Sequence, residues 1–155
     1  MPHATLDTPL GPLALVSDGE ALTSAAFEAE ALPGPSGPCS VLDAAREQLA
    51  AYFAGEAVAF DVPVRAGGTP FQARVWAALR EIPHGATLSY GDLARRLGDP
   101  NAAQAVGAAN GANPVAVVVP CHRVVGADGA LVGYAGGLGR KRALLDLESR
   151  QRRLF

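Results

Sequence analysis

A cysteine beside a histidine is the pair of residues in this chain best suited to covalent chemistry. Cys121 and His122 follow Pro120 and an unbroken apolar run at residues 115–119. The thiolate is the reactive form of cysteine and makes up only about a few per cent of a free thiol near pH 7, so an imidazole that accepts the proton raises reactivity. We predict that residues 115–119 form a buried strand that ends at Pro120 and presents the thiol. Taken alone, the pair also fits ordinary core packing.

The residues after this pair indicate the elements that position it. Residues 123–125 and 130–132 flank a glycine-rich turn at residues 126–129, which predicts a hairpin. Small residues at 134–137 form a loop that exposes backbone N–H groups. The spacing of apolar residues then predicts a final helix over residues 139–148.

The residues before the pair predict two helices joined by a tight turn. Ser89 can cap a helix over residues 90–97, with Asp92 as its reciprocal partner, and Gly98 turns the chain. The second helix is expected to begin at residues 99–100 and to end near Ala109. Its side chains are almost all small: Ala102, Ala103, Ala105, Gly107, Ala108 and Ala109. Such a smooth face suits close approach to a nucleic-acid groove, and equally suits tight packing against the protein's own core.

The N-terminal half reads as a separate α+β unit. Runs at residues 4–8, 12–17 and 22–27 predict an antiparallel meander, and residues 41–53 follow with helical spacing. Residues 60–64 alternate as a further strand would. Residues 66–68 are a candidate linker, after which Thr69, Pro70 and Gln72 mark the start of a helix that extends to Ile82. We therefore expect an N-terminal supporting domain at residues 1–66, a C-terminal domain at 69–149 and a basic tail at 150–155.

Charge divides the chain at the same place. Residues 1–67 carry two basic and nine acidic residues, a net charge of −7, whereas residues 68–155 carry eleven basic and six acidic residues, a net charge of +5. A basic C-terminal half favours a polyanionic partner, although a solvated basic domain has the same composition.

Composition narrows the class of protein further. The chain has 155 residues, 49% of them hydrophobic, no apolar run near the ~18 residues of a membrane helix, and no signal pattern at its start. Its two cysteines are expected to be free thiols in the cytoplasm. Outside the Cys-His pair only His3, Cys39 and His84 could bind zinc, too few for a closed tetrahedral site, so we predict neither metal nor cofactor.

Three motifs in order carry a resemblance to a known family. Residues 120–125 read PCHRVV, residues 105–114 before them read AVGAANGANP, and residues 134–137 after them read YAGG. Residues 69–148 closely resemble the O6-alkylguanine-DNA alkyltransferases, and the N-terminal half resembles the family's ribonuclease-H-like α+β domain. The resemblance implies an α+β protein whose C-terminal domain is mostly helical, of the winged-helix or helix-turn-helix type.

The resemblance also implies a reaction. Cys121 would take an alkyl group from O6 of guanine in duplex DNA, or from O4 of thymine, in one irreversible displacement. His122 would accept the thiol proton through a bridging water, and Glu148 would orient the imidazole. Asn113 would brace the turn between the recognition helix and the active-site strand.

A base inside a duplex must be flipped out before it can reach a thiol. By the resemblance, Tyr90 would rotate the phosphate and donate its hydroxyl to the purine. The carbonyls of Cys121 and Val124 would accept from the exocyclic amine, the N–H of Ala135 would donate to O6, and Tyr134 would line the alkyl pocket.

The chain departs from the family in the helix expected to contact DNA. Family members usually carry an intercalating arginine at the position of Gln104. Glutamine brings no cation, so DNA affinity would rest on Arg95, Arg96 or the basic last helix. The positions expected at the DNA surface are Ser89, Ala102, Ala103, Gln104 and Gly107.

Other functions remain to be weighed against suicidal alkyl transfer by a monomer. A binding-only damage sensor resembling the alkyltransferase-like proteins would carry tryptophan in place of Cys121. A helix-turn-helix regulator would require base-reading side chains that the alanine-rich helix lacks, and a Cys-His-Glu hydrolase would require turnover and an acyl-binding cleft.

Overall fold

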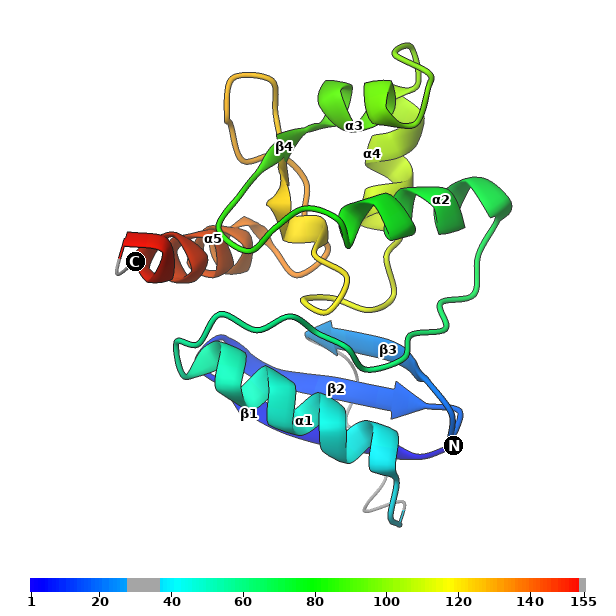
Figure 1. The fold of residues 1–155 in the computed structure, drawn as a ribbon, viewed down its shortest axis with the longest axis vertical. Helices are drawn as coiled ribbons and strands as arrows, with labels where there is room; N and C mark the ends of the chain where they lie inside the picture. The colour runs from blue at the N-terminus through cyan, green and yellow to red at the C-terminus, as the bar shows by residue number, and fades with distance from the viewer. Residues whose placement is uncertain (28–36, 154–155) are drawn as a thin grey trace. The chain divides into compact units, whose positions relative to one another are not determined.

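The computed structural model describes residues 1–27 and 37–153 and divides the chain into two compact units (Figure 1). The first unit comprises Met1–Gly67 together with Pro114–Val118, and the second comprises Gly68–Asn113 and Val119–Phe155. The acids at positions 28 and 30 and the last two residues of the expected tail lie outside the described residues.

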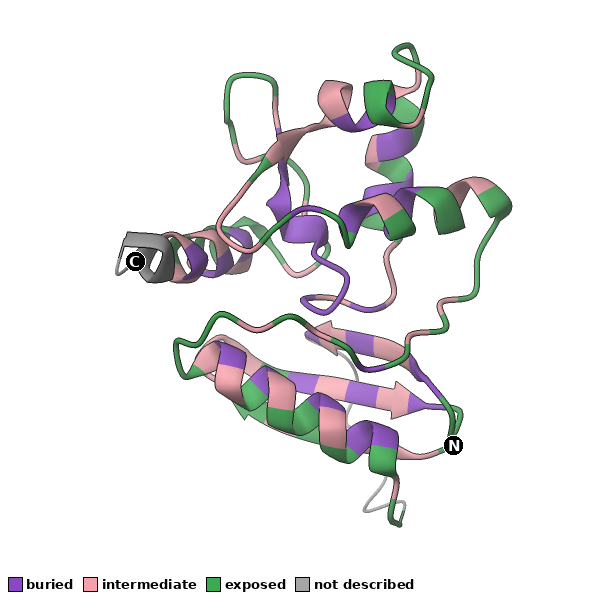
Figure 2. Cartoon of the chain, viewed as in Figure 1, coloured by how far each residue is buried: buried purple, intermediate pink, exposed green. Residues whose placement is uncertain are grey.

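The first unit is a three-stranded antiparallel sheet with one helix. Strands β1 (His3–Thr8), β2 (Gly11–Ser17) and β3 (Leu22–Phe27) pair in the order β1-β2-β3, which confirms the predicted meander. Alternate residues of β2 are buried (Figure 2), as a sheet with one covered face requires. Helix α1 (Ser40–Phe53) contacts all three strands. Its buried face consists of Val41, Leu42, Ala45, Leu49 and Tyr52.

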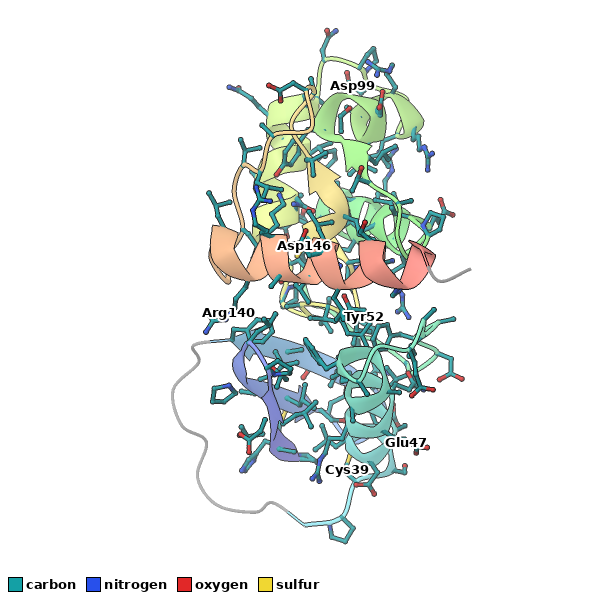
Figure 3. The ribbon with its side chains drawn as sticks, turned by 90° about the vertical axis from the view of Figure 1, so that its left-hand side faces the viewer. Cys39, Glu47, Tyr52, Asp99, Arg140 and Asp146 are labelled. Carbon is teal, nitrogen blue, oxygen red and sulfur yellow. The ribbon has the colours of Figure 1, made fainter. Side chains whose placement is uncertain are left out.

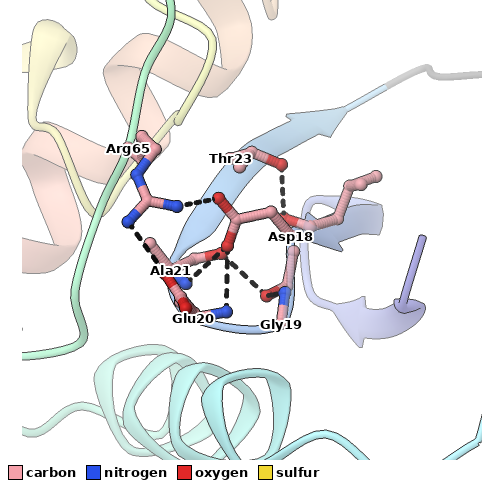
Figure 4. Close-up of polar contacts among 8 residues, drawn as sticks. Asp18, Gly19, Glu20, Ala21, Thr23 and Arg65 are labelled. Atoms are coloured by element: carbon pink, nitrogen blue, oxygen red, sulfur yellow. Dashed lines mark hydrogen bonds and ion pairs between the residues drawn. The ribbon is translucent and has the colours of Figure 1, made fainter.

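The chain after α1 is fixed to this sheet without forming the expected strand at residues 60–64. Only Val64 bridges to Leu22. Beside that bridge, both Asp18 and Glu20 accept from the Arg65 guanidinium, and Asp18 also accepts from the backbone N–H groups of Glu20 and Ala21 at 2.9 Å each (Figure 4). This segment is therefore held to the sheet by two backbone bonds, from the Leu22 N–H to Pro63 at 2.7 Å and from the Arg65 N–H to Leu22 at 2.9 Å, and by the ion pairs of Arg65.

Helix α2 (Pro70–Leu79) opens the second unit with the predicted capping box. The N–H of Gln72 donates to the Thr69 hydroxyl at 3.1 Å, and the Thr69 N–H donates to the Gln72 side chain at 2.9 Å. The helix ends three residues earlier than expected, while Ile82 is still buried beyond it. The indole of Trp76 donates to the carbonyl of Ala109 at 2.8 Å and so joins α2 to α4.

The helix pair is present, but its second helix begins later than predicted. Helix α3 (Tyr90–Arg96) is capped by Ser89, which accepts from the Asp92 N–H at 3.0 Å. Helix α4 spans Ala103–Gly111. It does not start at residues 99–100, because Asp99 closes a turn there, accepting from the N–H groups of Asn101 and Ala102 at 3.1 and 3.0 Å.

The prediction of a strand at residues 115–119 is wrong. Val115 makes a single bridge to Ala25. The chain then makes a γ-turn in which the Val118 N–H donates to the Ala116 carbonyl at 2.8 Å, and the central residue Val117 has φ 71°. This apolar run is buried by packing around a turn, a state that hydrophobicity alone does not distinguish from a strand.

The predicted hairpin after Cys121 is wrong as well. Strand β5 (Val124–Val125) follows the 3₁₀ helix η1 (Cys121–Arg123) and pairs in parallel with β4 (Leu88–Ser89). The turn itself is present, with the Gly126 N–H donating to Ala130 at 2.8 Å, but residues 130–132 form no strand. The last helix, α5, spans Leu138–Arg153, longer than expected at both ends (Figure 3 labels Arg140 and Asp146 on it).

None of the helices within the described ranges combines the length and the apolar character that a membrane span requires.

Candidate active site

Cys121 is the first residue of the 3₁₀ helix η1 and directly follows a tight turn at Pro120. Its N–H donates to the Val119 carbonyl at 2.8 Å across Pro120, whose φ of −83° and ψ of 64° are those of an inverse γ-turn. The Asn113 side chain donates to the same Val119 carbonyl at 2.9 Å. The thiol is therefore held by a turn that Asn113 ties down, and only 6% of the residue is exposed.

The neighbouring imidazole is completely buried and joined to a carboxylate on α5. Nε2 of His122 lies 2.6 Å from Oε2 of Glu148, and both side chains are buried. Nδ1 of His122 is also buried and has no hydrogen-bond partner among the described residues. One ring nitrogen is thus held in place while the other is left available.

Arg123 is the second partner of this carboxylate. Its Nε donates to Oε1 of Glu148 at 2.8 Å and its second guanidinium nitrogen donates to Oε2 at 3.1 Å, while the first donates to the Ile82 carbonyl at 2.7 Å. Burial by itself would raise the pKa of Glu148, but the hydrogen bonds and charges of His122 and Arg123 bring it well below its ordinary value. Glu148 is therefore ionised.

The protonation of His122 follows from its surroundings. Burial lowers its pKa; Glu148 opposes this shift, and the positive charges of Arg123 and Lys141 add to it. A neutral imidazole beside an ionised carboxylate carries its proton on Nε2, which leaves a lone pair on Nδ1. The arrangement can therefore accept a proton at Nδ1.

The thiol itself is held in its protonated form. Burial raises the pKa of Cys121, whereas a hydrogen bond from Asn113 and the charge of Lys141 lower it. The Cys121 carbonyl already accepts from the Val124 N–H and from Asn110 Nδ2, the latter at a long 3.3 Å.

Tyr90 lies near this group at the first position of α3. Its hydroxyl donates to the Val132 carbonyl at 3.0 Å. Burial raises the pKa of Tyr90, a hydrogen bond from Asn110 opposes the shift, and a negative charge on Cys121 adds to it. Gly107 of α4 faces the ring, since a Cβ there would lie 3.7 Å from it.

The remaining predicted residues occupy two regions. Val124 is fully buried, Tyr134 is half-buried with its hydroxyl unpartnered among the described residues, and Ala135 is exposed in the turn before α5. On the helix pair, Gln104 is exposed, Ala102 precedes the first residue of α4, and Ala103 is that first residue. Burial raises the pKa of Tyr134, which keeps its hydroxyl neutral.

Sequence reasoning missed three residues of this region: Asn110, Arg123 and Lys141. Two carried a signal. Arg123 directly follows His122, and Lys141 shares a helix face with Leu144 and Glu148 at spacings typical of a buried stripe. A charged residue at a core-facing position requires a partner. Within the described part of the chain, no group of three or more His, Cys, Asp or Glu residues could hold a metal ion.

Comparison with known proteins covers both halves of the chain. Two family models match: the DNA binding domain of 6-O-methylguanine DNA methyltransferase at residues 70–150 and its ribonuclease-like domain at residues 1–66. A protein of Mycobacterium tuberculosis named methylated-DNA--protein-cysteine methyltransferase is 50% identical over 151 residues, which cover 94% of this chain and 91% of that protein. One of the same name from Methanosarcina acetivorans is 46% identical over 153 residues, covering 96% and 98%.

Solved structures agree with the sequence matches. The crystal structure of Mycobacterium tuberculosis OGT in complex with DNA is 50% identical, covers 96% of this chain and 93% of its own, and superposes with a TM-score of 0.88. An O6-methylguanine DNA methyltransferase from Methanococcus jannaschii, at 27% identity, has a TM-score of 0.69.

Proposed function

Because this chain belongs to the methylated-DNA--protein-cysteine methyltransferase family, we propose that it repairs alkylated guanine in duplex DNA by moving the alkyl group to Cys121. The observation that carries the proposal is the buried thiol next to an imidazole whose Nδ1 is unpartnered and whose Nε2 is held by an ionised carboxylate. That is the protonation pattern a general base needs.

The reaction is a single displacement at the alkyl carbon. A bond forms between the sulfur of Cys121 and that carbon, and the bond from the carbon to guanine O6 breaks, with its electron pair remaining on guanine. The thiol proton passes through a bridging water to Nδ1 of His122. The guanine anion takes up one proton from solvent and His122 later returns one to solvent, so that the step balances. The thioether is not reversed, so each molecule reacts once.

Base stabilisation involves the groups around η1. Tyr90 donates to the purine as negative charge develops, and the Ala135 N–H donates to O6. The carbonyls of Cys121 and Val124 accept from the exocyclic amine. The long bond from Asn110 to the Cys121 carbonyl supports this role, because a bound amine can displace a weak donor at little cost.

DNA binding is assigned to the helix pair. Its exposed surface is small and uncharged around Gln104, with Ser89, Ala102, Ala103 and Gly107 as the expected contacts. A flat alanine-rich surface suits close approach to the minor groove. When the target nucleotide flips out, it leaves a gap in the base stack, which this surface would face. Residues 1–66, with which Pro114–Val118 form one compact unit, are assigned the supporting role, and the rest of residues 69–149 the reactive one. The basic tail at residues 150–155 begins as a continuation of α5, which reaches Arg153. The protein acts as a monomer in the cytoplasm, where Cys121 stays reduced.

Mass spectrometry tests the proposal directly. The protein is incubated with a duplex that contains one O6-methylguanine, and the intact protein and its peptides are analysed. We expect a stoichiometric gain of one methylene unit on the Cys121 peptide, absent in Cys121→Ala and retained in Cys39→Ala. Tight binding to the lesion without a mass gain would contradict the transfer reaction and favour a damage sensor, and an O4-methylthymine duplex extends the same assay to the second base.

A further inference from the structure

Lys141 is a charged residue that the fold buries and that the proposed chemistry leaves without a role. Its exposed fraction is 0%. Among the described side chains no carboxylate forms an ion pair with it. Because a buried ammonium is costly unless it is hydrogen-bonded, its position calls for a specific interaction.

That interaction is with the loop before α5. Nζ of Lys141 donates to the carbonyls of Val132 and Gly133 at 2.9 and 3.1 Å. The Tyr90 hydroxyl donates to the same Val132 carbonyl at 3.0 Å. The ammonium also lies 5.9 Å from the centroid of the Tyr90 ring, within the range of a cation–π contact. The lysine, the tyrosine and the loop therefore form one cluster.

The shared carbonyl constrains what Tyr90 can do. A hydroxyl has one proton, so Tyr90 donates either to Val132 or to another acceptor. In the proposed reaction the acceptor is the purine, and the bond to Val132 must break when the base enters. After that bond breaks, the Val132 carbonyl still accepts a hydrogen bond from the Lys141 ammonium.

We propose that Lys141 is a positioning residue for Tyr90: it holds the Val132 carbonyl, and with it residues 132–135, so that the tyrosine hydroxyl is free to donate to the flipped purine. The inference rests on the proposed function, since it assigns Tyr90 the purine as its second acceptor. The charge of Lys141 also lowers the pKa of Cys121, which supports placing a cation here.

Single-turnover kinetics over a range of protein concentrations provides the test, because it separates the apparent Kd for O6-methylguanine duplex from the maximal rate constant of methyl transfer. Lys141→Met is expected to lower the rate constant about 10- to 100-fold, the equivalent of one lost hydrogen bond to a charged donor, with little change in apparent Kd. Lys141→Arg, which keeps the charge and the donors, is expected to recover most of the rate.

Combination with Tyr90→Phe decides whether Lys141 acts through the hydroxyl. If it does, the Tyr90→Phe/Lys141→Met double variant reacts no more slowly than Tyr90→Phe by itself. Reductions that multiply, an unchanged rate in Lys141→Met, or a Lys141→Arg variant as slow as Lys141→Met would each overturn the proposal.

Two controls keep the result interpretable. Arg46→Met removes one positive charge from an exposed position of α1 and is expected to transfer methyl at the wild-type rate. Urea unfolding of each variant identifies any that fail to fold, and for those Lys141→Gln, which retains two N–H donors, replaces Lys141→Met in the cycle. Absence of transfer by the wild-type protein would overturn the proposed function itself, whereas transfer by the wild type with independent Lys141 and Tyr90 effects overturns only the role of Lys141.

Discussion

The buried side chains of His122 and Glu148 set each other's protonation, and Arg123 is the second partner of the carboxylate. Arg123 supplies the charge that keeps Glu148 ionised, and Glu148 then accepts the Nε2 proton of His122. The imidazole has therefore no freedom to present its protonated nitrogen to the thiol. The tautomer that the proposed reaction uses therefore follows from burying His122 and Arg123 against the same carboxylate.

Substitution of His122 tests the general base. His122→Asn removes the Nδ1 acceptor and is expected to slow methyl transfer about 10²- to 10⁴-fold, the usual contribution of a positioned base, while DNA binding is retained. Single-turnover rates and a filter-binding assay on the same duplex measure the two effects. His3→Asn, in the first strand, serves as the matched control and should react normally; a His122→Asn protein that reacts equally fast would remove His122 from the mechanism.

Acid stability tests the ionised state of Glu148. Its pKa is lower in the folded chain than the 4.5 of an ordinary glutamate, so its stabilising effect is complete above about pH 4.5 and is lost as pH falls through the folded value. Glu148→Gln should flatten this part of the pH dependence and cost about 3–5 kcal/mol at pH 7, because Arg123 is left buried and unpaired.

Urea unfolding between pH 3 and 7 measures both effects. The Arg123→Met/Glu148→Gln double variant should regain part of the loss, since neither charge of this pair remains. Glu47→Gln removes an exposed carboxylate from α1 (Figure 3) and should change the unfolding free energy by less than about 0.5 kcal/mol. Equal pH profiles for the wild type and Glu148→Gln would show that Glu148 is not the group responsible.

At the scale of elements, local signals predicted helix starts better than strands. Thr69 and Gln72 form the full predicted capping box, and Ser89 caps α3 as predicted, although the Asp92 carboxylate pairs with Arg95 and not with the Ser89 N–H. The run at residues 115–119 has the composition of a strand, yet Val117 takes a left-handed backbone conformation that β-branched residues avoid. Such a turn depends on distant contacts, among them the bridge from Val115 to Ala25, which no local pattern contains.

The candidate site follows the same division. Cys121 and His122 lie in a motif, and Glu148 followed from the family resemblance; the structure joins the last two by a hydrogen bond. Arg123 and Lys141 were missed because their positions in the sequence indicate burial but not their acceptors, which are a carboxylate 25 residues away and two loop carbonyls.

The junction before α2 provides a test of packing between elements. A Cβ at Gly68 would lie 2.6 Å from the ring of Trp76 and 2.7 Å from the Gln72 side chain, whereas one at Gly67 would meet nothing within 4 Å. Gly68→Ala should therefore displace the indole that bonds to Ala109 and cost about 1–3 kcal/mol of stability.

Fluorescence measures this displacement without ambiguity, because Trp76 is the single tryptophan of the chain. Gly68→Ala should shift its emission and lower the urea midpoint, while the adjacent Gly67→Ala should leave both close to wild type. An unshifted spectrum in Gly68→Ala would mean that the indole does not lie against this glycine.

At the scale of the whole molecule, the positive charge of the C-terminal half does not lie on α4, the helix expected to contact DNA. The C-terminal half is basic, yet helix α4 has no cation, and one of the two arginines of α3, Arg95, forms an ion pair with Asp92 of the same helix. The net charge of +5 on residues 68–155 attracts DNA at long range, whereas the expected contact surface on α4 provides shape alone. Affinity should then depend on salt less steeply than in a protein that neutralises many phosphates.

A single cation added to α4 tests whether its surface contacts DNA without neutralising phosphates. Gln104 is exposed on α4, and Gln104→Arg adds a guanidinium at the position where the family resemblance implies an intercalating arginine. We expect tighter binding to DNA and a slope of log affinity against log salt that is steeper by about 0.9, the effect of one more released counterion. Ala50→Arg adds the same charge to an exposed position of α1 and should leave the slope unchanged. Fluorescence anisotropy at several salt concentrations measures the DNA affinity of both variants. A cation placed against phosphates cannot lower affinity through its charge. Weaker binding by Gln104→Arg would therefore show that the surface of α4 does not face DNA.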